Sequence, residues 1–204
     1  MNALIFAGGR FSSLPEQVKL SEYDFFIAAD SGYLNAEALG IIPDIFVGDF
    51  DSVTEEQVKS KERVRLFPVK DMTDTQEAID IAISRGAKKI TILGALGGRI
   101  DHTTANLHLL KYGKSKGVSI DIQDTDTSIC LVPDELDVKK QEGFCLSLIP
   151  LTDCTGVSIS GVFYPLRDAS MPVGNPYGIS NEFVDDIAHI KVKTGDLLLM
   201  LVKS

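Results

Sequence analysis

Ile45-Phe46-Val47-Gly48-Asp49-Phe50-Asp51-Ser52 joins a short apolar run to a glycine and two acidic residues. An apolar run of this length, preceded by Pro43, is typical of a buried strand. Asp49 and Asp51 therefore follow the carboxyl end of a strand, which is where open α/β folds bind their ligands. Oxygen ligands without a neighbouring His or Cys suit a hard cation such as Mg²⁺.

The same arrangement recurs at other predicted strands. Residues 24–29 precede Asp30, residues 65–68 precede Lys70, Asp71 and Asp74, and residues 89–93 precede the glycines and Arg99 of residues 94–101. The carboxyl ends of parallel strands lie side by side at one edge of a sheet. We therefore expect these residues to converge on one crevice.

Length and composition limit the class of protein. The chain has 204 residues, 44% of them apolar, which suffices for one large domain or two small ones with a proper core. No apolar run approaches the roughly 20 residues that cross a bilayer, and the start lacks the basic segment of a signal peptide. Three irregularly spaced cysteines fit neither a disulfide framework nor a zinc site. We expect a cytoplasmic protein with free thiols and no membrane partner.

The net charge of −9 argues against nucleic-acid binding, because a phosphate backbone requires a basic surface. Acidic residues would also repel a bare polyphosphate. A bound divalent cation resolves this conflict, since the acids hold the cation that carries the phosphate.

Residues up to about 123 alternate between strand and helix patterns, which predicts a mostly parallel, Rossmann-like α/β sheet with helices on its faces. Strands are expected at residues 2–6, 24–29, 45–48, 65–68, 89–93 and 119–123. Helices are expected near residues 33–39, 52–61, 73–86 and 101–113. Thr73 and Gln76 have the spacing of a capping box, and Gly40, Gly86 and Gly113 are expected to end their helices.

The remaining sequence has a different character. Short apolar runs at residues 144–149, 157–160, 190–193 and 197–202 alternate with turns rich in Gly and Pro, and no amphipathic helix is recognisable. This pattern predicts a small β-sandwich. We expect an α/β domain over residues 1–124 and a β-sandwich domain over residues 125–204.

The acidic residues also have ordinary structural interpretations. Asp51 and Asp74 could cap the helices that follow them, and Asp71 could be an exposed loop residue. With Asp30 and Asp74 at neighbouring strand ends, metal binding becomes the favoured interpretation for Asp49 and Asp51.

Gly94-Ala95-Leu96-Gly97-Gly98-Arg99 precedes a predicted helix. Glycines let backbone N–H groups approach an anion, and a helix N-terminus favours negative charge. The stretch is not a Walker A motif, but Arg99 can bind phosphate oxygens with two hydrogen bonds. Asp101 could orient Arg99, join the metal shell or cap the helix, and Lys70 could reach a phosphate or remain solvated.

Several motifs cover nearly the whole chain in one order. They are Ala29-Asp30-Ser31-Gly32, Gly40-Ile41-Ile42-Pro43-Asp44, Gly48-Asp49-Phe50-Asp51-Ser52, Phe67-Pro68 with Lys70-Asp71-Met72-Thr73-Asp74, Gly97-Gly98-Arg99-Ile100-Asp101-His102 with Asn106, Gly161-Val162-Phe163-Tyr164-Pro165-Leu166, and Gly178-Ile179-Ser180-Asn181-Glu182. Together they resemble the motifs of the thiamine pyrophosphokinase family.

The resemblance implies an N-terminal catalytic domain for ATP and Mg²⁺ and a C-terminal domain for thiamine and dimerisation. It implies a homodimer whose active site lies between the catalytic domain of one subunit and the β-domain of the other. The implied reaction moves the β,γ-diphosphate of Mg-ATP to the hydroxyl of thiamine and releases AMP.

The resemblance also implies roles for particular residues. Catalytic roles fall to Asp30, Asp49, Asp51, Asp71 and Asp74, with Asp49, Asp51 and Asp74 as Mg²⁺ ligands. ATP contacts fall to Lys70, Thr73, Arg99, Asp101, His102 and Asn106, and thiamine contacts to Ser180 and Asn181. Asp71 and Asp74 are both candidates for accepting the hydroxyl proton. Some members use tryptophan near thiamine, and this chain has none, so Tyr177 or Phe183 would pack there unless both serve turn and core.

Two other functions remain open from the sequence. A diphosphokinase for another alcohol, such as a hydroxymethylpterin, would share the acidic turns, although residues 178–182 favour thiamine. A non-catalytic Mg-nucleotide binding module would need fewer acids than this chain carries. A purely structural protein fits the acid-bearing strand ends least.

Overall fold

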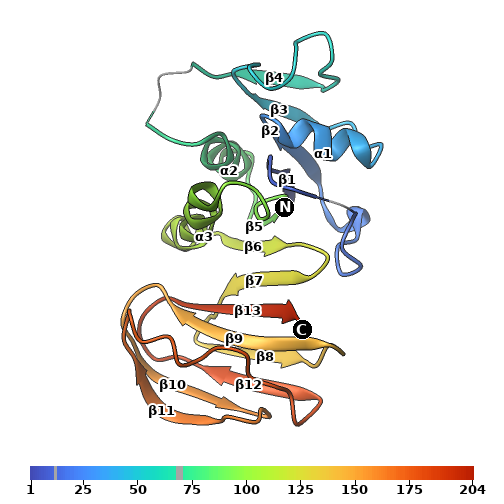
Figure 1. Ribbon diagram of the computed structural model, residues 1–204. Helices are drawn as coiled ribbons and strands as arrows, with labels where there is room; N and C mark the ends of the chain where they lie inside the picture. The colour runs from blue at the N-terminus through green and yellow to red at the C-terminus, as the bar shows by residue number, and fades with distance from the viewer. Residues whose placement is uncertain (12, 68–70) are drawn as a thin grey trace. The chain divides into compact units, whose positions relative to one another are not determined.

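The computed structural model describes residues 1–11, 13–67 and 71–204. The chain divides into two compact units, Met1–Thr125 and Asp126–Ser204 (Figure 1). The first unit has a parallel sheet with helices, and the second has antiparallel strands. The expectation of a mixed α/β fold is confirmed at this level.

The sheet of the first unit has the order β4-β3-β2-β1-β5-β6, and each neighbouring pair of strands is parallel. Its strands are β1 (Asn2–Phe6), β2 (Phe25–Ala29), β3 (Ile45–Gly48), β4 (Glu62–Arg65), β5 (Lys89–Leu93) and β6 (Ser119–Gln123). β1, in the middle of the sheet, is apolar throughout its buried part because a parallel strand is covered on both faces. Ala3, Leu4, Ile5 and Phe6 are all 0% exposed.

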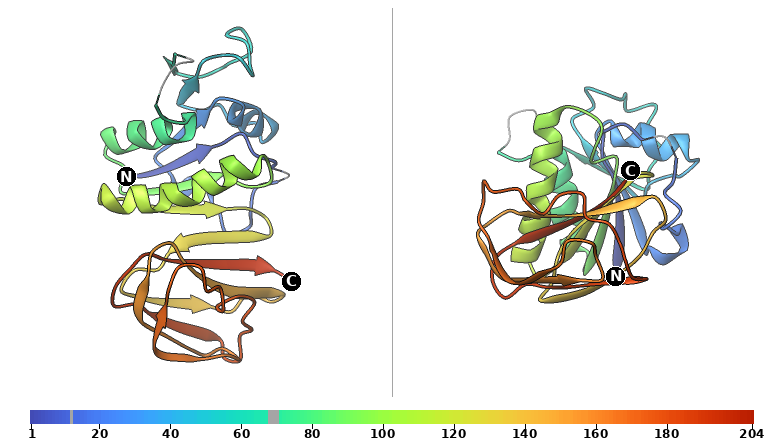
Figure 2. Two further views of the ribbon diagram at one scale, coloured as in Figure 1. Left: turned by 60° about the vertical axis from the view of Figure 1, so that its left-hand side comes forward. Right: turned by 60° about the horizontal axis from the view of Figure 1, so that its bottom comes forward.

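Helices cover both faces of this sheet (Figure 2). They are α1 (Gly32–Ala38), α2 (Asp74–Ser84) and α3 (Ile100–Ser115), with a short 3₁₀ helix η1 (Leu20–Glu22) before β2. α2 and α3 lie on one face and α1 on the other. This follows from right-handed crossovers, because the strand order reverses direction after β4. The reversal places the loops after β1, β2 and β5 together at the carboxyl edge of the sheet.

The helix predicted for residues 52–61 is wrong. All of these residues are described, and they form bends and a single turn. The strand predicted at residues 65–68 is displaced, since β4 ends at Arg65 and residue 68 lies outside the described residues.

Tertiary contacts explain this loop. Val53 and Val58 are buried in a cluster with Tyr33 and Phe46. The Tyr33 hydroxyl donates to the carbonyl of Gln57 (2.9 Å) and accepts from the N–H of Lys59 (3.0 Å). A side chain thus satisfies backbone groups that a helix would have paired.

The third helix also ends later than predicted. Gly113 lies inside α3, where a Cβ atom would come within 2.4 Å of Ile120 Cδ1. The helix stops at Ser115, and Gly117 follows with a φ of +71°. Gly113 therefore serves close helix–strand packing, and Gly117 occupies the left-handed position past the helix.

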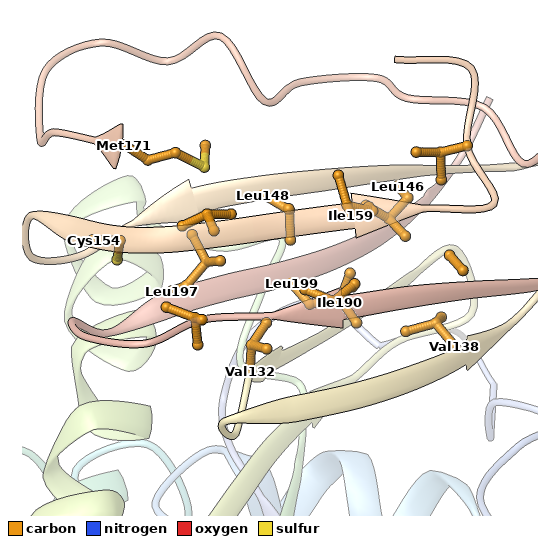
Figure 3. Packing of buried hydrophobic residues seen from close by; sticks show 14 of the residues in the cluster. Val132, Val138, Leu146, Leu148, Cys154, Ile159, Met171, Ile190, Leu197 and Leu199 are labelled. Atoms are coloured by element: carbon orange, nitrogen blue, oxygen red, sulfur yellow. The ribbon is translucent and has the colours of Figure 1, made fainter. Parts of the chain in front are cut away.

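The second unit consists of antiparallel strands in two groups, β7-β13-β9 and β11-β10-β12-β8. They are β7 (Thr127–Leu131), β8 (Glu135–Lys139), β9 (Phe144–Pro150), β10 (Cys154–Ser160), β11 (Leu166–Met171), β12 (Ile187–Lys191) and β13 (Leu197–Lys203). Side chains from both groups share one core (Figure 3). Residues 126–204 are all described and contain no helix, as predicted.

Three strands of this unit, β7, β8 and β11, were not predicted from the sequence. β8 and β11 bury only Val138 and Met171 respectively, so neither has a marked apolar pattern. β7 buries only Ile129. All three cysteines are free, and no described helix has the length and apolar character needed to span a membrane.

Candidate active site

A cavity of about 430 Å³ lies at the carboxyl edge of the parallel sheet. The loops after β1, β2 and β5 form it together with the first turns of α2 and α3. Among the residues predicted from the sequence, Asp30, Thr73, Asp74, Arg99, His102 and Asn106 line it. The convergence expected from parallel strand ends is therefore present.

The carboxylates of three aspartates meet at this edge. Asp30 follows β2, and Asp49 and Asp51 follow β3. One oxygen from each lies within 4.8 Å of the others. Such a set of oxygens fits a hard divalent cation.

The backbone is strained where it presents these acids. Asp30 has a φ of +49° and Phe50 a φ of +67°. A non-glycine residue in this region costs on the order of 1–3 kcal/mol and persists only when its surroundings impose it. The left-handed Phe50 bends the turn, so that Asp49 and Asp51 reach one point.

Phe50 is held in this conformation by its ring. The ring packs on Phe46 at 4.7 Å between centroids, and the Arg65 guanidinium lies 5.3 Å from the ring centroid. The N–H of Asp51 also donates to Asp49 Oδ1 (3.1 Å). Core packing, a cation–π contact and a local hydrogen bond thus offset the strain.

Asp30 is the most unusual acid of the cluster. Its Oδ1 is buried and has no hydrogen-bond partner among the described residues, a state that is rare in folded proteins. Burial raises the pKa of Asp30, the charges of Asp51 and Asp74 raise it further, and hydrogen bonds from Ser31 and Ser52 oppose the rise. A bound cation would satisfy the unpaired oxygen and relieve the repulsion.

Ser52 links two of these acids. Its Oγ lies 2.9 Å from both Asp30 Oδ2 and Asp51 Oδ1. A hydroxyl carries one proton, so it cannot donate to both carboxylates at once. Two ionised acids at this spacing therefore leave unpaired negative charge for a cation to neutralise.

Asp71 and Asp74 occupy different positions. Asp74 begins α2, where Thr73 Oγ1 caps the helix by accepting from the N–H of Gln76 (3.2 Å). Asp74 lines the cavity and its charge acts on Asp30, but the close oxygen cluster contains Asp30 in its place. Asp71 is exposed and lies outside the cavity lining. Lys70, predicted to contact ATP, falls outside the described residues.

Arg99 and Asp101 form a pair at the start of α3. Arg99 Nε and Nη2 donate to the two carboxylate oxygens of Asp101 at 3.1 and 2.6 Å. The Arg99 hydrogen bond, reinforced by the N–H of His102, lowers the pKa of Asp101 to about 2. The Asp101 carboxylate therefore orients Arg99 and also accepts from the N–H of His102 in the first turn of α3 (3.0 Å).

Asn106 reaches back from α3 to the preceding loop. It is 7% exposed, and its Nδ2 donates to the carbonyl of Ala95 (2.9 Å). The cavity lining also includes Gly8, Gly9 and Ser52, for which no sequence pattern predicted a role. The glycine pair directly after the strand at residues 2–6 was the available signal for the first two.

The second unit has its own cavity of about 390 Å³. Phe163, Tyr164, Tyr177, Ile179 and Asn181 are among its lining residues. Tyr177 thus lies at this cavity, whereas Phe183 packs against the core. Of the two candidate aromatics, only Tyr177 is placed for contact with a ligand.

Ser180 and Asn181 are used within the fold. Asn181 is 8% exposed; its Nδ2 donates to the carbonyl of Tyr164 (2.8 Å) and its Oδ1 accepts from the N–H of Tyr164 (2.9 Å). Ser180 is exposed with a φ of +55°, and its N–H donates to Ser147 Oγ (3.0 Å). Asn181 therefore fixes the turn that carries Phe163 and Tyr164.

Fold and site together define a class of protein. The chain is a two-unit α/β protein with an acidic, oxygen-rich cavity at the carboxyl edge of a parallel sheet and an aromatic cavity in its antiparallel unit.

Comparisons with known proteins narrow this class. Residues 17–122 match the thiamin pyrophosphokinase catalytic domain, and residues 134–199 match the thiamin pyrophosphokinase vitamin B1 binding domain. The chain is 31% identical over 205 residues to thiamine pyrophosphokinase of Bacillus subtilis, with 96% of each chain covered. The chain belongs to the thiamin pyrophosphokinase family, as the sequence motifs indicated.

Solved structures agree with this assignment. The crystal structure of thiamine pyrophosphokinase from Bacillus subtilis matches with a TM-score of 0.87 at 28% identity, covering 100% of both chains. A thiamin pyrophosphokinase family protein from Enterococcus faecalis matches with a TM-score of 0.88 at 31% identity, again over 100% of both chains. The similarity therefore extends over both units.

Proposed function

We propose that this protein transfers the β,γ-diphosphate of Mg-ATP to the hydroxyl of thiamine, giving thiamine diphosphate and AMP. Family membership over both units supports the substrates. The observation that carries the phosphate chemistry is the oxygen cluster of Asp30, Asp49 and Asp51 beside the cavity that Arg99 lines.

In this proposal Asp30, Asp49 and Asp51 hold Mg²⁺, with Asp74 close by. The unpaired Oδ1 of Asp30 and the single proton of Ser52 support this fit. When bound, Mg²⁺ supplies charge neutralisation and orientation of the phosphate oxygens. Asp101 holds Arg99 at the N-terminus of α3, where guanidinium and helix dipole both favour a phosphate.

The reaction is an in-line displacement at the β-phosphorus. The thiamine oxygen forms the new bond, the bond from the β-phosphorus to the α,β-bridging oxygen breaks, and AMP leaves with that oxygen. We infer that Asp74 accepts the hydroxyl proton, because it lines the cavity and Asp71 does not. Positioning and electrostatics supply most of the rate in reactions of this kind.

We assign ATP to the first unit, which we interpret as Rossmann-like. We assign thiamine to the second unit, whose two groups of strands we interpret as a β-sandwich. Tyr177 and the exposed Phe163 and Tyr164 offer aromatic faces to a cationic thiazolium ring. This arrangement provides ring contacts without tryptophan. The cytoplasmic location remains a prediction.

We further propose a homodimer in which the cavity of one subunit's first unit meets the aromatic cavity of its partner's second unit. Phe163 is 61% and Tyr164 64% exposed, and clustered exposed aromatics are typical of contact surfaces. Light scattering coupled to gel filtration should give twice the 22.2 kDa chain mass. A monomer at micromolar concentration would contradict the dimer.

The proposed reaction is tested by identifying both products after incubation with Mg-ATP and thiamine. AMP together with thiamine diphosphate supports it. ADP would mean transfer of a single phosphoryl group. AMP formed only with a pterin alcohol would reject thiamine as the acceptor substrate. Nucleotide binding without turnover on any acceptor would favour a binding module.

A further inference from the structure

We propose that Asn35 is a positioning residue for the nucleotide: its side-chain amide holds the loop after β1 in the shape that Mg-ATP binding requires. This inference rests on the proposed function, because it assigns the loop to the phosphate side of the cavity. Neither the sequence motifs nor the catalytic chemistry gave Asn35 a role.

Asn35 lies on α1 and is half-buried. Its Nδ2 donates to the carbonyl of Ala7 (2.7 Å) and to the carbonyl of Gly9 (3.0 Å). A side-chain amide nitrogen has two hydrogens, so both are used on one loop. Ala7 and Gly9 flank Gly8, and all three line the cavity.

The same amide touches the second glycine loop. Gly94 follows β5 with a φ of +67°, and a Cβ atom there would lie 2.8 Å from Asn35 Nδ2 and 2.4 Å from the Ala7 carbonyl oxygen. The two loops are also joined by the N–H of Gly9, which donates to the carbonyl of Gly94 (2.7 Å). Asn35 therefore sits where both loops meet, and glycine at position 94 permits the approach.

The chemistry of the wall explains why this matters. Backbone carbonyl oxygens repel phosphate oxygens, and Arg99 is the one lysine or arginine among the described residues that line the cavity. Asn35 binds two of these carbonyls, and Asn106 binds the Ala95 carbonyl of the other loop in the same way. Asparagine amides from α1 and α3 thus tie wall carbonyls to the protein.

The test compares Asn35→Asp with a matched control, Asn2→Asp. Asn2 lies at the opposite end of β1, and its Nδ2 also donates to a carbonyl, that of Glu22 (3.0 Å). The carboxylate introduced by Asn35→Asp would face the Ala7 and Gly9 carbonyls with an oxygen in place of the donor. Asn35→Asp loses two hydrogen bonds, and one net hydrogen bond is worth up to about tenfold. We therefore expect this variant to raise KM for Mg-ATP at least about tenfold, with KM for thiamine within about twofold of wild type. Asn2→Asp should change neither constant.

Asn35→Ala removes the donor without adding charge and replaces Asn35→Asp if that variant fails to fold, as judged by circular dichroism. Deuterium uptake of the peptide covering residues 4–11 should rise in the folded Asn35 variant and not in Asn2→Asp. A folded variant with wild-type KM for Mg-ATP, or with equal rises for both substrates, would overturn the inference.

The two proposals fail in different ways. A wild-type protein that neither binds Mg-ADP in calorimetry nor turns over would reject the proposed function. Unchanged deuterium uptake at residues 4–11 in Asn35→Ala would reject the positioning role of Asn35, whatever the activity of the variant.

Discussion

At the scale of the residue, unusual features concentrate on Asp30 and its neighbours. Asp30 combines a left-handed backbone, an unpaired buried oxygen and a raised pKa, which burial causes first. The Ser52 hydroxyl lies between Asp30 and Asp51 and can donate its one proton to only one of them at a time. These features make the cluster costly without a cation, which is typical of a site built for function.

The first prediction concerns Asp51. Asp51→Asn keeps the shape of the side chain and removes one of the three clustered charges. We expect turnover to fall at least about 100-fold, the scale of one lost electrostatic group in an active site. Thermal unfolding in EDTA should show equal or higher stability, because repulsion within the cluster is reduced. Wild-type turnover in the folded variant would remove Asp51 from the mechanism.

A second prediction separates the two candidate bases. Asp74→Asn should lower kcat by about 100-fold or more, the usual range for a general base. Asp71→Asn should stay within a few-fold of wild type, since Asp71 lies outside the cavity lining. The reverse pattern in steady-state kinetics would transfer the role to Asp71.

At the scale of the element, a polar network ties the β1–β2 connection to the sheet. The Tyr23 hydroxyl donates to Thr91 Oγ1 (2.9 Å), which lies 3.1 Å from Asp121 Oδ2. Gln123 Nε2 also donates to Asp121 Oδ2 (3.0 Å), and Gln123 Oε1 accepts from Gln17 Nε2 (2.9 Å). The connection that begins at the glycine loop is therefore anchored to β5 and β6.

This network predicts a pH effect on stability. Burial raises the pKa of Asp121, opposed by Gln123, Lys89 and Thr91. Because the folded pKa lies above the unfolded one, the stabilising contribution is present at low pH and is lost as pH rises through the folded pKa. Asp121→Asn should therefore melt a few degrees above wild type at pH 8 and no higher than it at pH 4. The exposed Asp126→Asn is the control, and destabilisation by Asp121→Asn at both pH values would contradict this account.

The sequence predicts elements best where one local pattern decides them. β1, β2, β3 and β5 are apolar because both faces of the sheet are covered there, so their positions were recognisable. β4 has no buried residue, and its predicted position was displaced. β8 and β11 bury one residue each, and the loop at residues 52–61 depends on Tyr33, which is distant in sequence. A local sequence pattern shows neither a strand with a single buried residue nor a loop held by a residue distant in sequence.

In the candidate site, too, the features set by local sequence patterns were predictable and those set by contacts distant in sequence were not. Acids at neighbouring strand ends were predictable from the topology of parallel sheets. The grouping of Asp30 with Asp49 and Asp51 depends on the φ of Phe50 and on the packing of its ring. The inward bonds of Asn181 to Tyr164 depend on a turn 17 residues away. Both are tertiary features, which single-sequence reasoning does not reach.

At the scale of the whole molecule, the two units carry separate parts of the proposed task. The first has the acidic cavity and the second the aromatic one. A substitution in the cavity of the first unit should therefore change KM for Mg-ATP, and one in the cavity of the second unit should change KM for thiamine.

Tyr177→Ala tests this separation. Loss of an aromatic face should raise KM for thiamine about tenfold, in line with a cation–π contact of ~1–2 kcal/mol, with little change in KM for Mg-ATP. Val173→Ala, on the same exposed loop but outside the cavity lining, is the control. A selective rise in KM for Mg-ATP would contradict the assignment of thiamine to the second unit.

The central claim is that Asp30, Asp49 and Asp51 form the cation site of the first unit. Its most direct test is Mn²⁺ binding with ADP, followed by electron paramagnetic resonance, in wild-type protein and in Asp30→Asn. We predict saturable Mn²⁺ binding to the wild-type protein and a loss of affinity of at least about tenfold in the folded variant, the usual minimum for a disturbed metal site. Equal Mn²⁺ affinity in the two proteins, or no protein-bound Mn²⁺ in the wild type, would contradict the account.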